Sequence, residues 1–193
     1  MANTPSTMVE LGTKMPEFEL QDSDGKPHGS GELRGAPGVL VVFFSNHCPF
    51  VKHIREQFVA LAHEYLDKGL KVIAINANDY RAYPDDSPER MREVAREYGM
   101  RFPFLLDESQ EVAKRFRAAC TPDFFLFDGR QELVYRGQMD DSRPGNDKPI
   151  TGADLRGAIE AVLAGRPVPS EQRPSMGCNI KWKPGNEPDY YGS

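Results

Sequence analysis

The feature that most constrains the fold is an uninterrupted apolar run at residues 39–44. A β-branched and aromatic run without polar alternation is typical of a strand that is buried on both faces, as in the middle of a parallel sheet. Pro49 follows at a place suited to the first turn of a helix, and apolar residues then recur every three or four positions up to Tyr65. The segment therefore predicts a central strand that leads through a short loop into an amphipathic helix, which ends near Gly69.

Strands and helices continue to alternate after this first pair. Periodicity, capping residues and turn residues predict a strand at 70–75, a helix from Ser87-Pro88 to Gly99, a strand at 102–106, a short helix at 110–118, a hairpin of strands 124–127 and 132–136, and a helix from Thr151 to Gly165. Thr151 and Asp154 have the spacing of a capping box at the start of the last helix. This order predicts parallel strands with right-handed crossovers, followed by antiparallel strands.

The predicted fold class is therefore α/β, with a mixed central sheet flanked by helices on both faces. An N-terminal hairpin is expected at residues 17–21, with Asp24-Gly25 after it. Residues 1–10 are expected to be a flexible N-terminus, and residues 11–165 the folded domain. Residues 166–193 are rich in proline and glycine and lack periodicity, which predicts an extended or disordered C-terminal tail.

Charge and composition exclude several functional classes. The 193 residues include 24 Lys and Arg against 29 Asp and Glu, a net charge of −5 without a basic run, so no nucleic-acid partner is expected. No apolar stretch approaches the roughly 20 residues that span a bilayer, and the first residues lack the pattern of a secretory signal. We therefore expect a cytoplasmic protein without a membrane partner. Three cysteines are too few for a disulfide scaffold, which favours reactive or simply buried thiols.

Cys48 lies in the loop between the buried strand and the helix that Pro49 opens. A sulfur at the N-terminus of a helix is close to unpaired N–H groups and to the positive end of the helix dipole, which stabilise a thiolate. His47 and Lys52 are near enough in sequence to add positive charge. An inert buried cysteine is the alternative, but the carboxyl end of a strand is where open α/β sheets place their sites.

Three segments carry a resemblance to a known group of proteins. Residues 43–52, Phe-Phe-Ser-Asn-His-Cys-Pro-Phe-Val-Lys, resemble the active-site strand and helix of thioredoxin-fold proteins, with Cys48 at the first cysteine of their C-x-x-C motif. Residues 120–128 resemble the loop in which thioredoxins carry a cis-proline, here Pro122. Residues 15–35 are similar to the opening of the alkyl hydroperoxide reductase and thiol-specific antioxidant family. The resemblance implies a thioredoxin-like, peroxiredoxin-like fold with an Asn-His-Cys-Pro active-site motif.

The sequence departs from both patterns. Val51 stands where a thioredoxin has its second cysteine, and Val42 where many thioredoxins have a buried acid. Ser45 agrees with the Thr or Ser that precedes a peroxidatic cysteine, but Val41 replaces the expected proline. The arginine that would polarise a peroxide is also missing from its expected place beside Pro122. Three other basic side chains remain candidates for that role: Arg143, Arg136 and Lys52.

Cys48 therefore needs a resolving thiol from elsewhere in the chain or from a small external thiol. Cys120 precedes Pro122 by two residues, so the resemblance places it near Cys48, although a small buried residue is the equally weighted alternative. Cys178 lies on the tail, as the resolving cysteine does in many peroxiredoxins. The tail could be anchored by its aromatic residues Trp182, Tyr190 and Tyr191.

The resulting hypothesis is a thiol-dependent oxidoreductase or antioxidant protein in which the Cys48 thiolate reduces a peroxide or exchanges with a disulfide, resolved by Cys120 or Cys178. The residues expected to contact substrate or activate the thiol are Ser45, His47, Pro49, Lys52, Thr121 and Pro122. The expected electron donor is a thioredoxin or a low-molecular-weight thiol, and the sequence leaves a homodimer open. No cofactor or metal is expected, because no paired ligand motif is present. Asp79, Asp85 and Asp86 are interpreted as a solvated acidic loop. The alternative function is a thioredoxin-fold binding module whose lone active-site cysteine reacts poorly.

Overall fold

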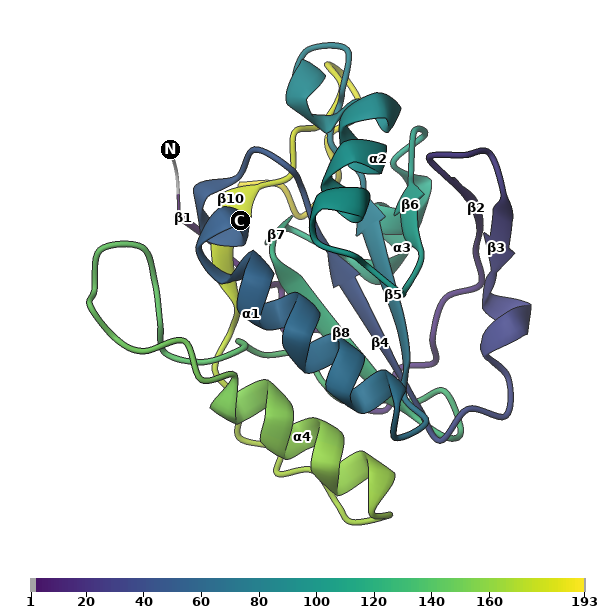
Figure 1. Cartoon of the computed structure of the whole chain (residues 1–193), viewed down its shortest axis with the longest axis vertical. Coiled ribbons are helices and arrows are strands. Elements are labelled where there is room, and N and C mark those ends of the chain that lie inside the picture. The colour runs from purple at the N-terminus through teal and green to yellow at the C-terminus, as the bar shows by residue number, and fades with distance from the viewer. Residues whose placement is uncertain (1–2, 193) are drawn as a thin grey trace.

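The computed structural model describes residues 3–192, and its centre is a mixed β-sheet (Figure 1). The order of the strands is β3-β2-β6-β5-β4-β8-β9. Strands β4, β5 and β6 are mutually parallel, whereas β8 and β9 are antiparallel, which confirms the predicted mixed sheet. The strands span Glu19–Asp22 (β2), Pro27–Gly29 (β3), Gly38–Phe43 (β4), Lys71–Asn76 (β5), Phe104–Leu106 (β6), Asp123–Asp128 (β8) and Leu133–Tyr135 (β9).

Helices cover both faces of this sheet. They span Pro49–Leu66 (α1), Pro88–Glu97 (α2), Glu111–Phe116 (α3) and Ala153–Leu163 (α4). Figure 1 shows α1 and α4 on one face, with α3 on the other. None of the helices within residues 3–192 is long and apolar enough to cross a membrane. The predicted helices are therefore present, with ends that differ by a few residues.

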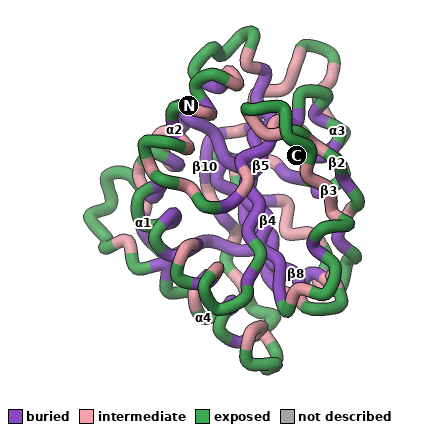
Figure 2. Tube along the Cα trace, turned by 45° about the vertical axis from the view of Figure 1, so that its right-hand side comes forward, coloured by how far each residue is buried: buried purple, intermediate pink, exposed green. Residues whose placement is uncertain are grey.

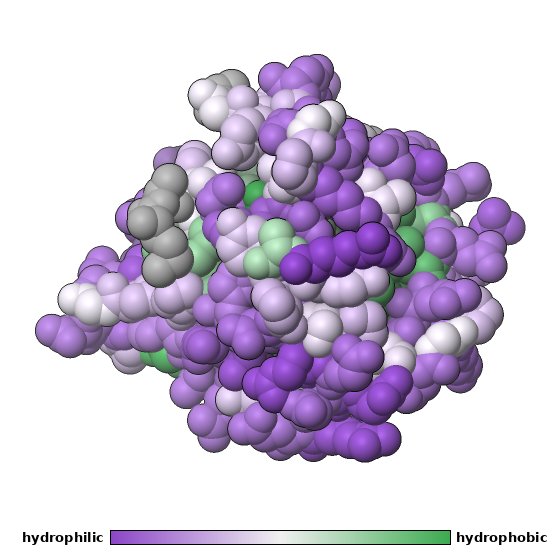
Figure 3. All heavy atoms as spheres, turned by 90° about the horizontal axis from the view of Figure 1, so that it is seen from above, coloured by the Kyte–Doolittle hydropathy of each residue, from purple (hydrophilic) through white to green (hydrophobic). Residues whose placement is uncertain are grey.

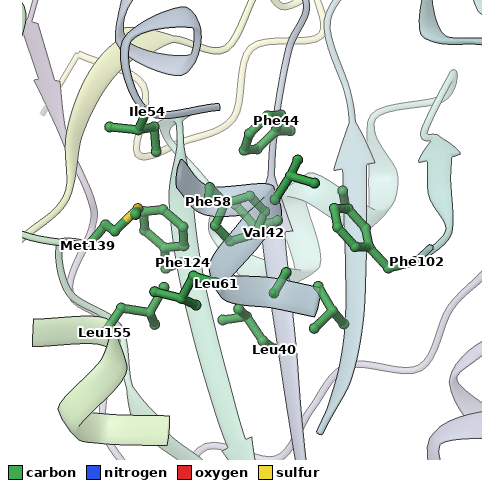
Figure 4. Close-up of a cluster of buried hydrophobic side chains, with 14 of the residues drawn as sticks. Leu40, Val42, Phe44, Ile54, Phe58, Leu61, Phe102, Phe124, Met139 and Leu155 are labelled. Atoms are coloured by element: carbon green, nitrogen blue, oxygen red, sulfur yellow. The ribbon is translucent and has the colours of Figure 1, made fainter. Parts of the chain in front are cut away.

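Strand β4 is buried along its whole length, as Figure 2 shows. Its side chains alternate between two hydrophobic clusters, one on each face of the sheet. Leu40 and Val42 face α1, where they meet Phe58 and Phe124 in the cluster drawn in Figure 4. On the other face, Phe43 packs edge to face against Phe116 and Phe125. Burial on both faces explains why the run contains no polar residue.

The last helix begins differently from the sequence prediction. Its N-cap is Gly152, not Thr151, and it has no side-chain cap. Gly152 has a φ of 68°, and a Cβ there would lie 2.6 Å from Leu61 Cδ1, so glycine suits both the conformation and the space. Asp154 accepts a hydrogen bond from Gln138 instead of closing a capping box. The capping-box prediction was therefore wrong, although the helix itself was correctly expected.

Both ends of the chain join a second, small sheet that the sequence did not suggest. Strand β10 (Met176–Asn179) lies between β1 (Asn3–Pro5) and β7 (Cys120–Thr121), antiparallel to both. The segment expected to be flexible at residues 1–10 thus contains β1, while residues 1, 2 and 193 lie outside the described part of the chain. Of the two expectations for the tail, extended or disordered, the described part is extended.

The tail is held by hydrogen bonds and by aromatic packing. Lys181 N donates to Asn78 Oδ1, and its carbonyl accepts from Asp79 N, both at 2.8 Å. Trp182 and Tyr190 meet edge to face, and the Tyr190 hydroxyl donates to Ala118 O at 2.8 Å. Tyr191, the third expected anchor, is instead 53% exposed. Two of the three predicted aromatic residues therefore fix the tail to the domain.

Candidate functional site: a pair of cysteines at the start of helix α1

Cys48 is the N-cap residue of α1, and Pro49 is in the first turn of that helix. The sulfur lies at the carboxyl end of β4, among the first N–H groups of the helix, as the sequence predicted. The Cys48 N–H donates to Ser45 Oγ at 3.3 Å, and Ser45 Oγ lies 3.4 Å from Thr121 Oγ1. Ser45 thus ties the loop before the helix to the loop before β8. The Cys48 residue itself is only 1% exposed.

The Thr121–Pro122 peptide bond is cis and faces this cysteine, as the resemblance implied. Cys48 Sγ, in its thiol form, donates to Thr121 O at 3.2 Å. The Pro122 carbonyl accepts from Ser175 Oγ at 2.6 Å, a contact from the C-terminal tail. The proline loop is therefore held between the start of α1 and the tail.

The tail brings Cys178 to Cys48. In β10, Cys178 lies opposite Thr121, and its Sγ is 2.7 Å from Cys48 Sγ. Both residues are buried, and the two sulfurs are not joined by a disulfide in this structure. An approach this close requires only a small movement for the two sulfurs to reach the bonding distance of about 2.05 Å. Of the two candidate partners for Cys48, the structure brings Cys178 into contact.

Cys120 faces a different environment. Its Sγ contacts Pro122 O at 3.5 Å and is completely buried. Burial raises the pKa of this thiol well above its ordinary value, and the neighbouring Asp123 carboxyl raises it further. Burial likewise raises the pKa of Asp123 to about 7. A thiol that is kept protonated in the core is a poor nucleophile, so these contacts fit the buried structural role of Cys120.

The pKa values of the two thiols at the site are shifted in opposite directions. The pKa of Cys48 is lowered to about 5, first because the Cys178 thiol donates to it and further by the Thr121 side chain and the Val51 N–H, against the opposing effect of burial. The same contact raises the pKa of Cys178, and burial adds to that rise. Near neutral pH the pair therefore consists of a Cys48 thiolate and a Cys178 thiol that donates to it.

His47 and Asp86 form an ion pair directly beside Cys48. Asp86 is fully buried, and it accepts hydrogen bonds from Asn46 N at 2.7 Å, Asn78 Nδ2 at 3.0 Å and Asn76 Nδ2 at 3.1 Å. Burial would raise the pKa of this carboxyl, but the hydrogen bonds from His47 and the amides outweigh it and lower the pKa. The Asp86 hydrogen bond in turn raises the pKa of His47. The contact with Asp86 therefore favours the charged form of the imidazole next to Cys48.

This network corrects the interpretation of residues 79–86 as a solvated acidic loop. Asp79 and Asp86 are buried, and only Asp85 is exposed. The reason is topological, because β5 is the parallel neighbour of β4 and the loops after the two strands meet at one edge of the sheet. The predicted adjacency of these two strands, together with the amide side chains of Asn76 and Asn78, could have indicated that a carboxylate of this loop is buried.

Two further residues of the site were not expected from the sequence. Tyr83 stacks on the His47 ring, with ring centroids 5.6 Å apart and planes inclined by 6°. Lys181 Nζ lies 5.9 Å from the Tyr83 ring centroid, and it comes from the tail segment that follows Cys178. Tyr83 is 40% exposed, so this group forms the outer rim of the site. The whole edge, seen from above in Figure 3, is mostly hydrophilic with small separate apolar patches.

Two of the three other basic side chains proposed from the sequence have partners elsewhere. Arg136 donates to Val9 O and Gln172 Oε1, and Arg143 donates to Gln138 Oε1 and to the Asp140 carbonyl. Lys52 is exposed on α1. Within residues 3–192, none of these three cations forms a hydrogen bond with Cys48.

Replacing Asp86 by asparagine is expected to return the pKa of His47 towards its ordinary value and to destabilise the fold by about 3 kcal/mol, because a buried charged network loses its centre. In the wild-type protein, the contribution of Asp86 to the free energy of unfolding is present above the pKa of Asp86 in the unfolded chain. It is lost as the pH falls through the lowered pKa in the folded protein. The contribution of His47 to the free energy of unfolding is present below about pH 6.5 and is lost as the pH rises through its raised pKa in the folded protein. The loss of stability in the Asp86→Asn variant should therefore be largest between about pH 4 and pH 6.5.

The measurement is an NMR titration of the His47 ring, together with urea unfolding across this pH range. The matched control is Asp85→Asn, which removes a neighbouring exposed carboxylate. An Asp86→Asn variant that titrates like the wild-type protein at His47 would contradict the ion pair.

A comparison with known families agrees with this architecture. The profile of the AhpC/TSA family matches residues 11–136, well over half of the chain. The chain belongs to the AhpC/TSA family. A solved structure of a hypothetical protein from Sinorhizobium meliloti 1021 superposes on this chain with a TM-score of 0.93 and 50% identity, covering 94% of this chain and 100% of the other. The fold therefore recurs over almost the whole chain in a solved structure.

More distant members of the thioredoxin superfamily are also similar. The thiol-disulfide oxidoreductase ResA of Geobacillus thermodenitrificans is 25% identical over 138 residues, which are 70% of this chain and 75% of the relative. A thiol:disulfide interchange protein of the thioredoxin family from Chlorobium tepidum TLS superposes with a TM-score of 0.62 at 19% identity, covering 80% of this chain and 98% of the other. The latter likeness establishes the thioredoxin-like fold and confirms the expected fold class.

Proposed function

We propose that this protein is a thiol-disulfide oxidoreductase in which Cys48 is the nucleophile and Cys178 is the resolving cysteine. The observation that carries the proposal is the 2.7 Å separation of the two sulfurs at the N-terminus of α1. Cysteine at such a position has the thiolate character that disulfide exchange requires. The name of the ResA relatives, thiol-disulfide oxidoreductase, supports the same class of reaction.

The reaction consists of two exchanges. The Cys48 thiolate attacks one sulfur of a disulfide, the substrate S–S bond breaks, and one substrate thiolate leaves. The Cys178 thiol then loses its proton to solvent and attacks Cys48 Sγ, so that the mixed disulfide breaks and the second substrate thiolate leaves. The two cysteines lose two electrons in forming the Cys48–Cys178 disulfide, and the substrate gains them as it becomes two thiols.

The charges at the site favour this order. The negative charge on Cys48 raises the pKa of Cys178 while Cys48 is free. Once Cys48 is part of a mixed disulfide, its hydrogen bond and its charge no longer raise the pKa of Cys178, so that pKa falls, although burial still raises it while Lys181 and the Phe50 N–H lower it. The second thiol is thus activated by the completion of the first exchange.

Disulfide is favoured over peroxide as the substrate. A peroxide needs a donor that stabilises the departing oxygen, but two of the three basic side chains considered for that role, Arg136 and Arg143, donate to carbonyls and amides elsewhere, and Lys52 is exposed on α1. His47 is next to Cys48 in the sequence, but its Nδ1 is paired with Asp86. A thiolate leaving group has a much lower pKa and leaves without such a donor. The oxidised pair would be reduced again by a thioredoxin or a low-molecular-weight thiol.

The test is to mix the reduced protein with glutathione disulfide without oxygen, and to measure released thiol and map the cysteines. We expect two glutathione thiols per chain and a Cys48–Cys178 disulfide, and the same result for the control variant Cys120→Ala. A parallel reaction with hydrogen peroxide should be slower. A protein that reacts with neither oxidant faster than free cysteine does would contradict the proposal and favour a thioredoxin-fold binding module.

A further inference from the structure

Gly177 lies where β10 passes over the cis-proline loop. A Cβ atom at this position would lie 2.0 Å from Thr121 O, 2.6 Å from Thr121 C and 3.2 Å from Pro122 N. The first of these is the shortest such distance for any glycine of the chain, and all three neighbours are backbone atoms. Gly177 has no left-handed φ, so the requirement for glycine here concerns space and not backbone conformation.

The proline loop cannot move away from an added side chain without losing its own contacts. Ser175 Oγ holds the Pro122 carbonyl, and Asp123 Oδ2 accepts from Ala119 N at 3.0 Å on the other side of the loop. Thr121 is also paired with β10 through the register that places it opposite Cys178. Any side chain at position 177 must therefore displace β10, which among residues 3–192 is paired only with the short strands β1 and β7.

The part of β10 that would be displaced is Gly177, which directly precedes Cys178. We propose that Gly177 is the positioning residue that holds Cys178 within reach of Cys48, and that it thereby determines whether a Cys48 mixed disulfide is resolved inside the chain. This inference rests on the proposed disulfide exchange. It separates the two exchanges, because Gly177 acts on the attack by Cys178 and leaves the attack by Cys48 to the start of α1.

The test variant is Gly177→Ala, compared with the wild-type protein in rapid mixing with glutathione disulfide, followed by acid quenching and mass spectrometry. Near pH 7, formation of the Cys48–glutathione adduct should keep its rate within about threefold, because weakening the Cys178 hydrogen bond lowers the thiolate fraction of Cys48 but raises the nucleophilicity of its thiolate. Conversion of the adduct to the Cys48–Cys178 disulfide should slow by about 100-fold, an effect that misplacing a reacting group by about 1 Å can have. An added external thiol should release the adduct of both proteins at similar rates, because that reaction does not use Cys178.

Two controls define the result. Met176→Ala changes the same strand without adding an atom over the proline loop, and it should resolve the adduct like the wild-type protein. Cys178→Ser should accumulate the adduct as Gly177→Ala does. Resolution by Gly177→Ala within twofold of the wild-type rate would overturn the role of Gly177 alone. Equal loss of both exchanges would show a general folding defect and would also overturn it. A wild-type adduct that Cys178 does not resolve would overturn the proposed function together with this inference.

Discussion

Replacing Cys48 by serine is expected to abolish disulfide reduction. A serine hydroxyl at the start of α1 would occupy nearly the same volume, but it would remain protonated near neutral pH and could form neither the mixed disulfide nor the internal one. The measurement is turnover of a model disulfide in the presence of a reducing thiol. Because the replaced atom is buried and similar in shape, the free energy of unfolding should change far less than the activity does.

Cys120→Ala is the matched comparison for this variant. It removes the third sulfur from a completely buried position, where cysteine behaves as a small apolar residue. We expect it to keep turnover close to that of the wild-type protein. Turnover by the Cys48→Ser variant at a comparable rate would show that Cys48 is not the nucleophile. Loss of turnover in Cys120→Ala, with turnover kept in the Cys178 variants, would show that Cys120 is the resolving cysteine.

The core of the site could be predicted because local signals and topology agree there. The short β-branched and aromatic run at residues 39–44 is typical of a strand covered on both faces, and Pro49 indicates the start of the next helix. Together they place Cys48 at a strand end and a helix N-terminus, as the structure shows. Each of these conclusions depends on neighbours in the sequence, where the physical constraints are strongest.

The tail could not be predicted in the same way. Strand β10 has only four residues, and Met-Gly-Cys-Asn carries no alternation that would indicate a strand. Its order comes from pairing with residues more than fifty positions away and from the missing side chain at Gly177. The burial of Asp86 is likewise a consequence of tertiary structure, because Asn46 and His47, which stabilise it, lie in the loop after β4, about forty positions away. Sequence periodicity does not record such contacts.

The same distinction separates the two cysteines of the proposed cycle. Cys48 owes its place to α1, whereas Cys178 owes its place to a strand that is held from outside the main sheet. A C-x-x-C motif fixes both sulfurs within one helical turn, but here Val51 fills the second place and is fully buried. The position of the second sulfur can therefore change without any change in α1, which makes the resolving step sensitive to the tail.

Replacing Cys178 by alanine is expected to have two large effects that can be measured separately. Turnover through the internal disulfide should be lost, because the Cys48 mixed disulfide has no internal thiol to resolve it and only the slower reaction with an external thiol remains. The pKa of Cys48 should also rise from about 5 towards the ordinary thiol value of about 8.5, because the donated hydrogen bond that contributes most to its low value is removed.

The second effect is measured as the midpoint of the Cys48 alkylation rate against pH. A wild-type thiolate should be fully formed above about pH 6, whereas the Cys178→Ala variant should ionise progressively at higher pH. Cys178→Ser is the informative control, since its hydroxyl can still donate to the thiolate, so its midpoint should lie between the other two while its turnover is lost as well. An unchanged midpoint in Cys178→Ala would show that the start of α1 and the His47–Asp86 pair suffice to stabilise the thiolate, and that the second sulfur serves resolution alone.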